Sequence, residues 1–145
     1  MNAVPRIRWL LGVGSGAAAI LLAACASMSG GKAIDVTLSG AEEVPAVATA
    51  ARGSGKFTVG EDKSVSGGIT VTGLSPVAAH IHTGARGQNG PVAVPLQKTG
   101  DAGWSVAPGA KFTDAQYEAF KAGNTYVNVH TPANKGGEIR GQLRP

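Results

Sequence analysis

Short segments in which apolar and polar residues alternate recur along the chain from about residue 33 to its end. In the segment 126–130, for example, Val127 and Val129 alternate with residues that are more polar. A period of two is typical of a β-strand with one buried face and one face in water. The segments with this pattern are 35–39, 56–59, 69–72, 77–82, 92–96, 126–130 and 138–143. The pattern predicts an all-β domain whose polar positions face solvent.

Glycine accounts for 22 of the 145 residues, and many of the glycines separate these segments. Glycine supplies the backbone conformations that tight turns require. At least seven short strands within one domain of this length predict a Greek-key sandwich or flattened barrel of about seven or eight strands. On the strand 77–82, the alternation assigns Val77, Ala79 and Ile81 to the core.

One short helix is predicted among the strands. Thr113 and Gln116 have the spacing of a capping box, with Thr113 as the N-cap. Gly123 is placed to end the helix in the left-handed conformation, so the helix is expected over residues 114–122. Tyr117 and Phe120 form its apolar stripe, and we expect this stripe to pack into one end of the β-structure.

The N-terminus has the pattern of a secretory signal. Arg6 and Arg8 precede an apolar stretch over residues 10–22, and small residues follow that stretch. The sequence Leu-Ala-Ala-Cys that ends at Cys25 resembles a bacterial lipobox, in which the cysteine sulfur is lipidated and the chain is cut just before it. A signal peptide with an incidental cysteine is the alternative. A transmembrane anchor is disfavoured because about 13 apolar residues fall short of the ~20 that span a bilayer.

These features divide the chain into three parts: a lipoprotein signal peptide (1–24), a flexible tether that begins with lipidated Cys25 (25–32) and a folded domain (33–145). The expected location is the cell envelope, facing the periplasm or the cell surface. In a host with two membranes we expect the outer membrane, because Ala26 rather than aspartate follows Cys25.

Charge argues against one class of partner. The whole chain carries +4, and removal of Arg6 and Arg8 with the signal leaves the mature chain near neutral. A nucleic-acid-binding protein needs a dense basic face. The expected partners are therefore a membrane, through the lipid at Cys25, and a metal ion, and not a nucleic acid; no protein partner can be predicted.

The chain has three histidines, and all of them fall on the polar side of their predicted strands. His80 and His82 share one face of the strand 77–82, about 6.5–7 Å apart along it. His130 lies on the polar face of the strand 126–130. If these strands are neighbours, the three imidazoles could bind copper or zinc. The alternatives are histidines held in ordinary hydrogen bonds and, with less support, a catalytic role.

Other polar residues are expected around the histidines. Asn128, Glu138, Arg140 and Gln142 occupy the same polar faces, so Asn128, Glu138 and Arg140 are predicted to surround a metal site without binding the metal. An ion pair between Glu138 and Arg140 is the ordinary structural explanation of those two residues. Glu42 and Glu43 are adjacent, so their side chains should diverge, and we expect a solvated edge there rather than an acid–base pair.

Five motifs in order carry a family resemblance. They are Glu43-Val44-Pro45, Ala79-His80-Ile81-His82-Thr83-Gly84, Asn89-Gly90-Pro91-Val92, Tyr126-Val127-Asn128-Val129-His130-Thr131 and Gly136-Gly137-Glu138-Ile139-Arg140-Gly141-Gln142-Leu143. Together they resemble the CHRD domain, first described in chordin and common in bacterial secreted proteins. One departure is Ala46, where the family often has a second proline. The resemblance implies a fold class and no general biochemical activity.

A fainter resemblance concerns the histidines. Their order along the chain is similar to that in copper/zinc superoxide dismutase, and by position His80, His82 and His130 would match three copper ligands. The chain lacks a fourth histidine, zinc-loop histidines and a cysteine pair, and the stretch 83–91 is too short for a zinc loop. A dismutase would also need a cation to attract superoxide, for which Arg86 and Arg140 are the candidates.

Three functional hypotheses follow from these observations. The first is a lipid-anchored CHRD binding module that holds a copper or zinc ion through its three histidines. The second is a metalloenzyme of the dismutase type. The third is a structural or adhesive envelope protein whose histidines serve only in hydrogen bonds.

Overall fold

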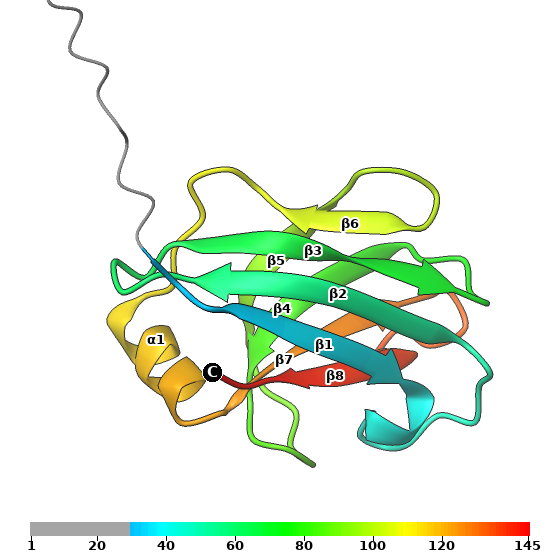
Figure 1. Ribbon diagram of the computed structural model, residues 1–145. Helices are drawn as coiled ribbons and strands as arrows, with labels where there is room; N and C mark the ends of the chain where they lie inside the picture. Colours follow the sequence, from blue (N-terminus) through cyan, green and yellow to red (C-terminus); the bar gives the residue numbers. More distant parts are fainter. Residues whose placement is uncertain (1–29) are drawn as a thin grey trace, which may run out of the picture.

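The computed structural model describes residues 30–145; the predicted signal peptide, Cys25 and most of the predicted tether lie outside the described residues. Eight strands and one short α-helix make up the described part (Figure 1). The elements are β1 (Ala33–Ser39), the 3-10 turn η1 (Gly40–Glu42), β2 (Arg52–Val59), β3 (Val65–Thr72), β4 (Ala78–Thr83), β5 (Val92–Lys98), β6 (Gly103–Val106), α1 (Asp114–Lys121), β7 (Thr125–His130) and β8 (Ile139–Leu143). No helix among residues 30–145 is long and apolar enough to cross a membrane.

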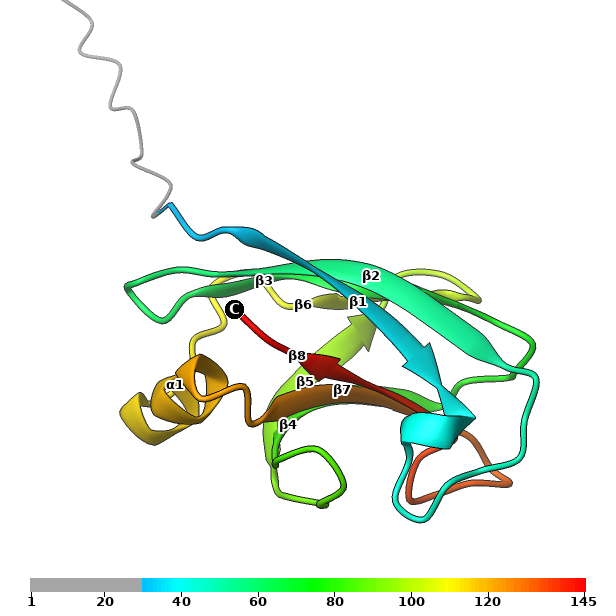
Figure 2. The ribbon, with the colours of Figure 1, turned by 60° about the horizontal axis from the view of Figure 1, so that its bottom comes forward.

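The strands form a closed antiparallel barrel in the order β1-β2-β3-β6-β5-β4-β7-β8. Strands β4, β5 and β6 follow one another as antiparallel neighbours, and β7 returns to lie beside β4, which is a Greek-key arrangement. Figure 2 shows β7 between β4 and β8. The predicted all-β flattened barrel with one short helix is confirmed. The return of β7 beside β4 is the step that brings His130 next to the other two histidines.

The inward side chains of all eight strands form one apolar core. Ile81 and Val129, which the alternation assigned to the core, are fully buried. The remaining fully buried apolar side chains include Leu38, Phe57, Val127, Ile139 and Leu143. The register of β4 and β7 is therefore the predicted one, and their histidines point away from the core.

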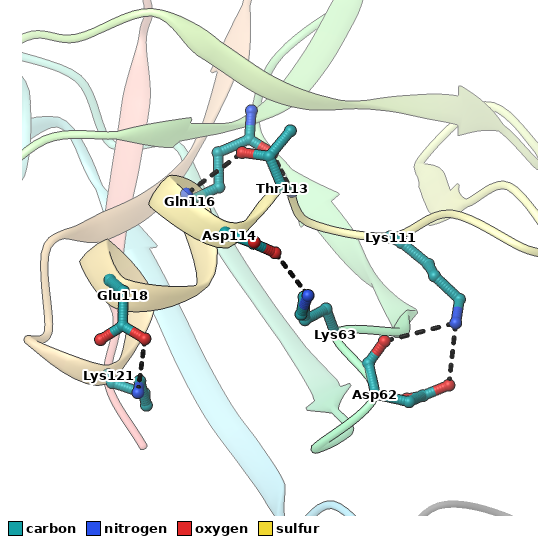
Figure 3. A network of polar contacts seen from close by, with 8 residues as sticks. All are labelled: Asp62, Lys63, Lys111, Thr113, Asp114, Gln116, Glu118 and Lys121. Atoms are coloured by element: carbon teal, nitrogen blue, oxygen red, sulfur yellow. Dashed lines mark hydrogen bonds and ion pairs between the residues drawn. The ribbon is translucent and has the colours of Figure 1, made fainter.

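The helix α1 closes one end of the barrel and begins with the predicted capping box. The Thr113 side chain accepts a hydrogen bond from the Gln116 backbone N–H (3.3 Å), and the Gln116 side chain accepts one from the Thr113 N–H (2.8 Å) (Figure 3). Gly123 follows the helix with a φ of +73°, as expected. Phe120 is buried, and ion pairs such as Lys63 with Asp114 bind the first turn to the β2–β3 hairpin.

Two details of the strands differ from the prediction. The strand β6 was not predicted, because only Trp104 and Val106 mark its inward face. Val77 was predicted in the core, but its side chain is 59 % exposed. The cause is its position: β4 begins at Ala78, and β5 pairs with β4 only from His80 onward, so no strand covers Val77 on that side.

Candidate metal centre

The three histidines meet on the outer face of the barrel because β4 and β7 are antiparallel neighbours. Ala78 is opposite His130 in this pair, and His80 is opposite Asn128. His80 and His82 lie two residues apart on β4, so both imidazoles project from the outer face. His130, at the end of β7, projects from the same face beside Ala78, two residues before His80.

The imidazoles converge on one point. One ring nitrogen of each histidine lies within 4.8 Å of the corresponding nitrogens of the other two. The shortest separation is 2.9 Å, between His80 Nδ1 and His130 Nε2. Bonds of about 2.0–2.1 Å to a tetrahedral ion place ligand nitrogens roughly 3.4 Å apart. Small side-chain rotations would therefore bring all three nitrogens into contact with one ion.

Backbone carbonyl groups determine which nitrogens are available. His82 Nδ1 is 3.0 Å from the Gly90 carbonyl oxygen, and His130 Nδ1 is 2.9 Å from that of Lys135. A carbonyl can only accept, so both Nδ1 atoms carry the proton and both Nε2 atoms present lone pairs. In metalloproteins the same type of hydrogen bond orients a ligating imidazole and sets its tautomer.

His80 differs from the other two histidines because its Nδ1 contacts another imidazole and not a carbonyl group. Because His130 Nε2 presents a lone pair, His80 Nδ1 is the donor of their shared hydrogen bond. Transfer of that proton to the other nitrogen of His80, which is half-buried, would free Nδ1 as a third ligand. His80 Nδ1 and His130 Nε2, which share a proton in this hydrogen bond, are thus two of the atoms that could bind a metal ion.

The His82 imidazole is buried, with 8 % of the residue exposed, and among residues 30–145 its Nε2 has no partner within hydrogen-bond distance, although the Asn128 side chain lies near enough to raise the pKa of the ring. Burial lowers the pKa of both His80 and His82 below the ordinary value, and the neighbouring His130 lowers each further, while the hydrogen bond to Gly90 opposes the shift of His82. Both rings are therefore held toward the neutral form, which metal ligation requires. An unpartnered buried lone pair beside two other imidazoles is the property that a metal site would use.

The outer face around the histidines is covered, although the alternation predicted it to be wet. Tyr126, Asn128 and Arg140 are all buried there. Three loops, 40–51, 84–91 and 131–138, lie over this face and supply polar partners to it. Sequence periodicity describes only the two faces of a strand, so it does not reveal a second layer formed by loops.

The residues predicted around the metal site have different contacts. Asn128 lies between His82 and Glu43 on this face and donates to the Gly136 carbonyl (3.3 Å). Glu138 accepts hydrogen bonds from Thr49 (2.9 Å), Thr131 (2.6 Å) and Asn134 (3.3 Å), and it contacts no histidine through a hydrogen bond. It ties down the loop that carries the Lys135 carbonyl.

Arg140 does not pair with Glu138 as the ordinary explanation supposed. Its guanidinium donates to the Ala85 carbonyl (3.0 Å) and to the side-chain oxygens of Asn89 and Gln142 (both 3.4 Å). The guanidinium carbon is 3.5 Å from the centre of the Tyr126 ring. On the other side, the Tyr126 ring is parallel to the His82 ring, with 4.9 Å between centroids and 4° between planes.

Glu43 corrects the prediction of a solvated edge. Only 5 % of Glu43 is exposed, and its Oε1 has no hydrogen-bond partner. Glu42 does lie at the surface, where it pairs with Arg86. Burial raises the pKa of Glu43 to about 7, although the charge of Arg140 opposes that rise. The signal that could have found Glu43 is its place in the first of the five motifs.

We expect Glu43→Gln to change how stability depends on pH. The folded state raises the pKa of this carboxyl, so between pH 4.5 and about 7 it binds a proton that the unfolded state releases. The free energy of unfolding of the native protein should therefore fall through this window and then level off. Glutamine does not titrate, so the free energy of unfolding of the variant should not fall in this way. Relative to the native protein, it should rise by about 1–3 kcal/mol between pH 5 and pH 8.

Urea denaturation at the two pH values measures this change. The same substitution at the exposed Glu61 is the control and should leave the pH dependence unaltered. If the free energy of unfolding depended on pH in the same way for Glu43→Gln and for the native protein, Glu43 would titrate as a surface carboxyl does.

The five motifs quoted from the sequence all meet at this outer face. Asn89 of the third motif donates to the Val44 carbonyl of the first (2.7 Å), and Arg140 of the fifth donates to Asn89. Gly90 accepts from His82 of the second motif, and its N–H donates to the Tyr126 hydroxyl of the fourth (3.2 Å). Motifs that lie far apart in the chain thus form one connected site.

Comparison with known proteins agrees with this reading of the motifs. No curated protein and no solved structure matches the chain. The family model of the CHRD domain matches residues 34–143, from the second residue of β1 to the last residue of β8, and this match covers all five motifs. The chain belongs to the CHRD-domain family.

Proposed function

We propose that this CHRD domain is a metal-binding module that holds one copper or zinc ion through His80, His82 and His130. The observation that supports it best is the buried His82 Nε2, which has no partner and lies beside the nitrogens of the two other histidines. A buried nitrogen acceptor without a partner is costly, and ligation of a cation would satisfy it. Imidazole is a suitable ligand for both Cu²⁺ and Zn²⁺.

Binding is favoured over superoxide turnover by the cations around the site. Arg140 is buried against Tyr126, and Arg86 is paired with Glu42. Neither guanidinium is therefore free to attract an anionic substrate to the histidines. The proposed role is to capture or store a metal ion, with water in the remaining coordination position.

Calorimetric titration of the soluble domain with Cu²⁺ and with Zn²⁺ at pH 7.5 tests the proposal. We expect one ion per chain for the native protein and no specific binding for a variant with all three histidines changed to alanine. Affinity should fall as the pH is lowered through and below ~6.5, because protonated imidazole cannot bind a metal. Equal binding by the two proteins would refute the proposal.

We further propose that the domain is anchored to the cell envelope by a lipid on Cys25, as the lipobox-like sequence suggests. Two or three acyl chains on one cysteine hold a protein far more firmly than a single chain does. Cys25→Ser should therefore move the protein from the membrane fraction to the soluble fraction. Ser27→Ala, two residues away, is the control, and retention of Cys25→Ser in the membrane would contradict the anchor.

A further inference from the structure

Arg140 is an unusual residue for a buried position under the loops on the outer face of this small barrel. Only 1 % of it is exposed, yet among residues 30–145 no carboxylate lies within hydrogen-bond distance of its guanidinium, and Glu43 acts on it through charge alone. All three of its acceptors are neutral. Burying a charge without a hydrogen-bonded counter-ion is costly, and an apolar residue of similar volume would avoid that cost. The position of Arg140 therefore calls for an explanation other than stability.

One route from Arg140 to the histidines passes through stacked rings. The guanidinium lies on one face of Tyr126, and the His82 imidazole lies parallel to the other face. A cation on an aromatic face is attracted by the ring, and the flat guanidinium suits this contact better than an ammonium does. The sandwiched Tyr126 ring in turn fixes the plane of the His82 imidazole.

A second route passes through the loop 84–91. Arg140 donates one hydrogen bond to the Ala85 carbonyl and another to Asn89. These two hydrogen bonds hold the loop near both of its ends. The same loop supplies the Gly90 carbonyl that accepts the proton of His82 Nδ1. The Tyr126 hydroxyl accepts a hydrogen bond from the Gly90 N–H, so the stacking route and the loop route meet at Gly90. Ring plane and tautomer of His82 thus both depend on Arg140.

We propose that Arg140 is a positioning residue of the metal centre: it clamps the Tyr126 ring and the loop 84–91 so that His82 Nε2 faces His80 and His130. This inference rests on the proposed metal-binding function. It distinguishes Arg140 from Glu138, which ties down a different loop and has no stacking contact with a histidine.

The test compares Arg140→Lys with Arg144→Lys, the same substitution at an exposed arginine directly after the end of β8. Each variant is titrated with Cu²⁺, and the electron paramagnetic resonance spectrum of the bound Cu²⁺ is recorded. We expect Arg140→Lys to lower the affinity about 10–100-fold and to change the spectrum, because lysine keeps the charge but cannot form the planar stack. Arg144→Lys should match the native protein in both measurements.

The outcomes separate the two proposals. If the native protein binds no Cu²⁺, the proposed function fails. If the native protein and Arg140→Lys bind alike with the same spectrum, only the positioning role fails. If Arg140→Lys does not fold, Tyr126→Leu decides, because it removes the ring through which Arg140 acts on the His82 imidazole. A weaker site with an altered spectrum would support the role of the clamp, and an unchanged site would overturn it.

Discussion

Replacement of His82 by alanine is expected to weaken binding of Cu²⁺ and Zn²⁺ by at least about 100-fold. Loss of a residue that only orients a ligand commonly costs 10–100-fold, and loss of a ligand should cost more. His82 is expected to contribute most because its Nε2 is buried and unpartnered, whereas His80 and His130 are within hydrogen-bond distance of each other.

Glu138→Gln is the matched comparison for this prediction. Glu138 acts only through the loop that holds the Lys135 carbonyl against His130, so its change to glutamine should lower affinity by less than about tenfold. Calorimetry or competition with a chelator measures both variants. If Glu138→Gln weakened binding more than His82→Ala did, the ion would have to lie elsewhere on this face.

Ile81→Ala is expected to lower the free energy of unfolding by about 2–5 kcal/mol. Ile81 is fully buried between the two histidines of β4, and its truncation removes apolar contacts and leaves a cavity in a closed barrel. Urea denaturation of the metal-free protein gives this value. Val77→Ala is the control: its side chain is largely exposed, so its loss should change stability by less than about 0.5 kcal/mol.

If Ile81→Ala and Val77→Ala lowered the free energy of unfolding by similar amounts, the register of β4 would have been assigned wrongly. The prediction also bears on the metal centre, because Ile81 separates His80 from His82 along the strand. A partial loss of affinity in Ile81→Ala would show that the core side of β4 supports the positions of its outer side chains.

The faces of β4 and β7 could be predicted from the sequence because the side-chain period of a strand is a local property. Ile81 and Val129 face the core, and the histidines beside them face away, as the alternation predicts. The proximity of His130 to His80 depends instead on which strands pair. Strand pairing over fifty residues is a property of the whole topology, so the alternation left it open.

The cover over the outer face could not be predicted in the same way. Glu43 is buried because the segment after η1 brings it beside Asn128 of β7 and Arg140 of β8, and nothing in the pair Glu42-Glu43 distinguishes this carboxyl from that of Glu42, which pairs with Arg86 at the surface. The stack of Arg140, Tyr126 and His82 likewise joins three strands. Family motifs carried this information: each buried polar residue on this face belongs to one of the five motifs.

The placement of α1 has a consequence for how such a domain would stand on a membrane. The chain enters β1 beside α1, at the end of the barrel where Gly30 and Lys32 approach Tyr117 and Pro145 (Figure 1). His130 is five residues along β7 from Thr125, about 17 Å toward the opposite end. If Cys25 carries the proposed lipid, the helix end of the barrel would face the headgroups, and His82, which is opposite Tyr126, would lie nearer to them along β7 than His130 does.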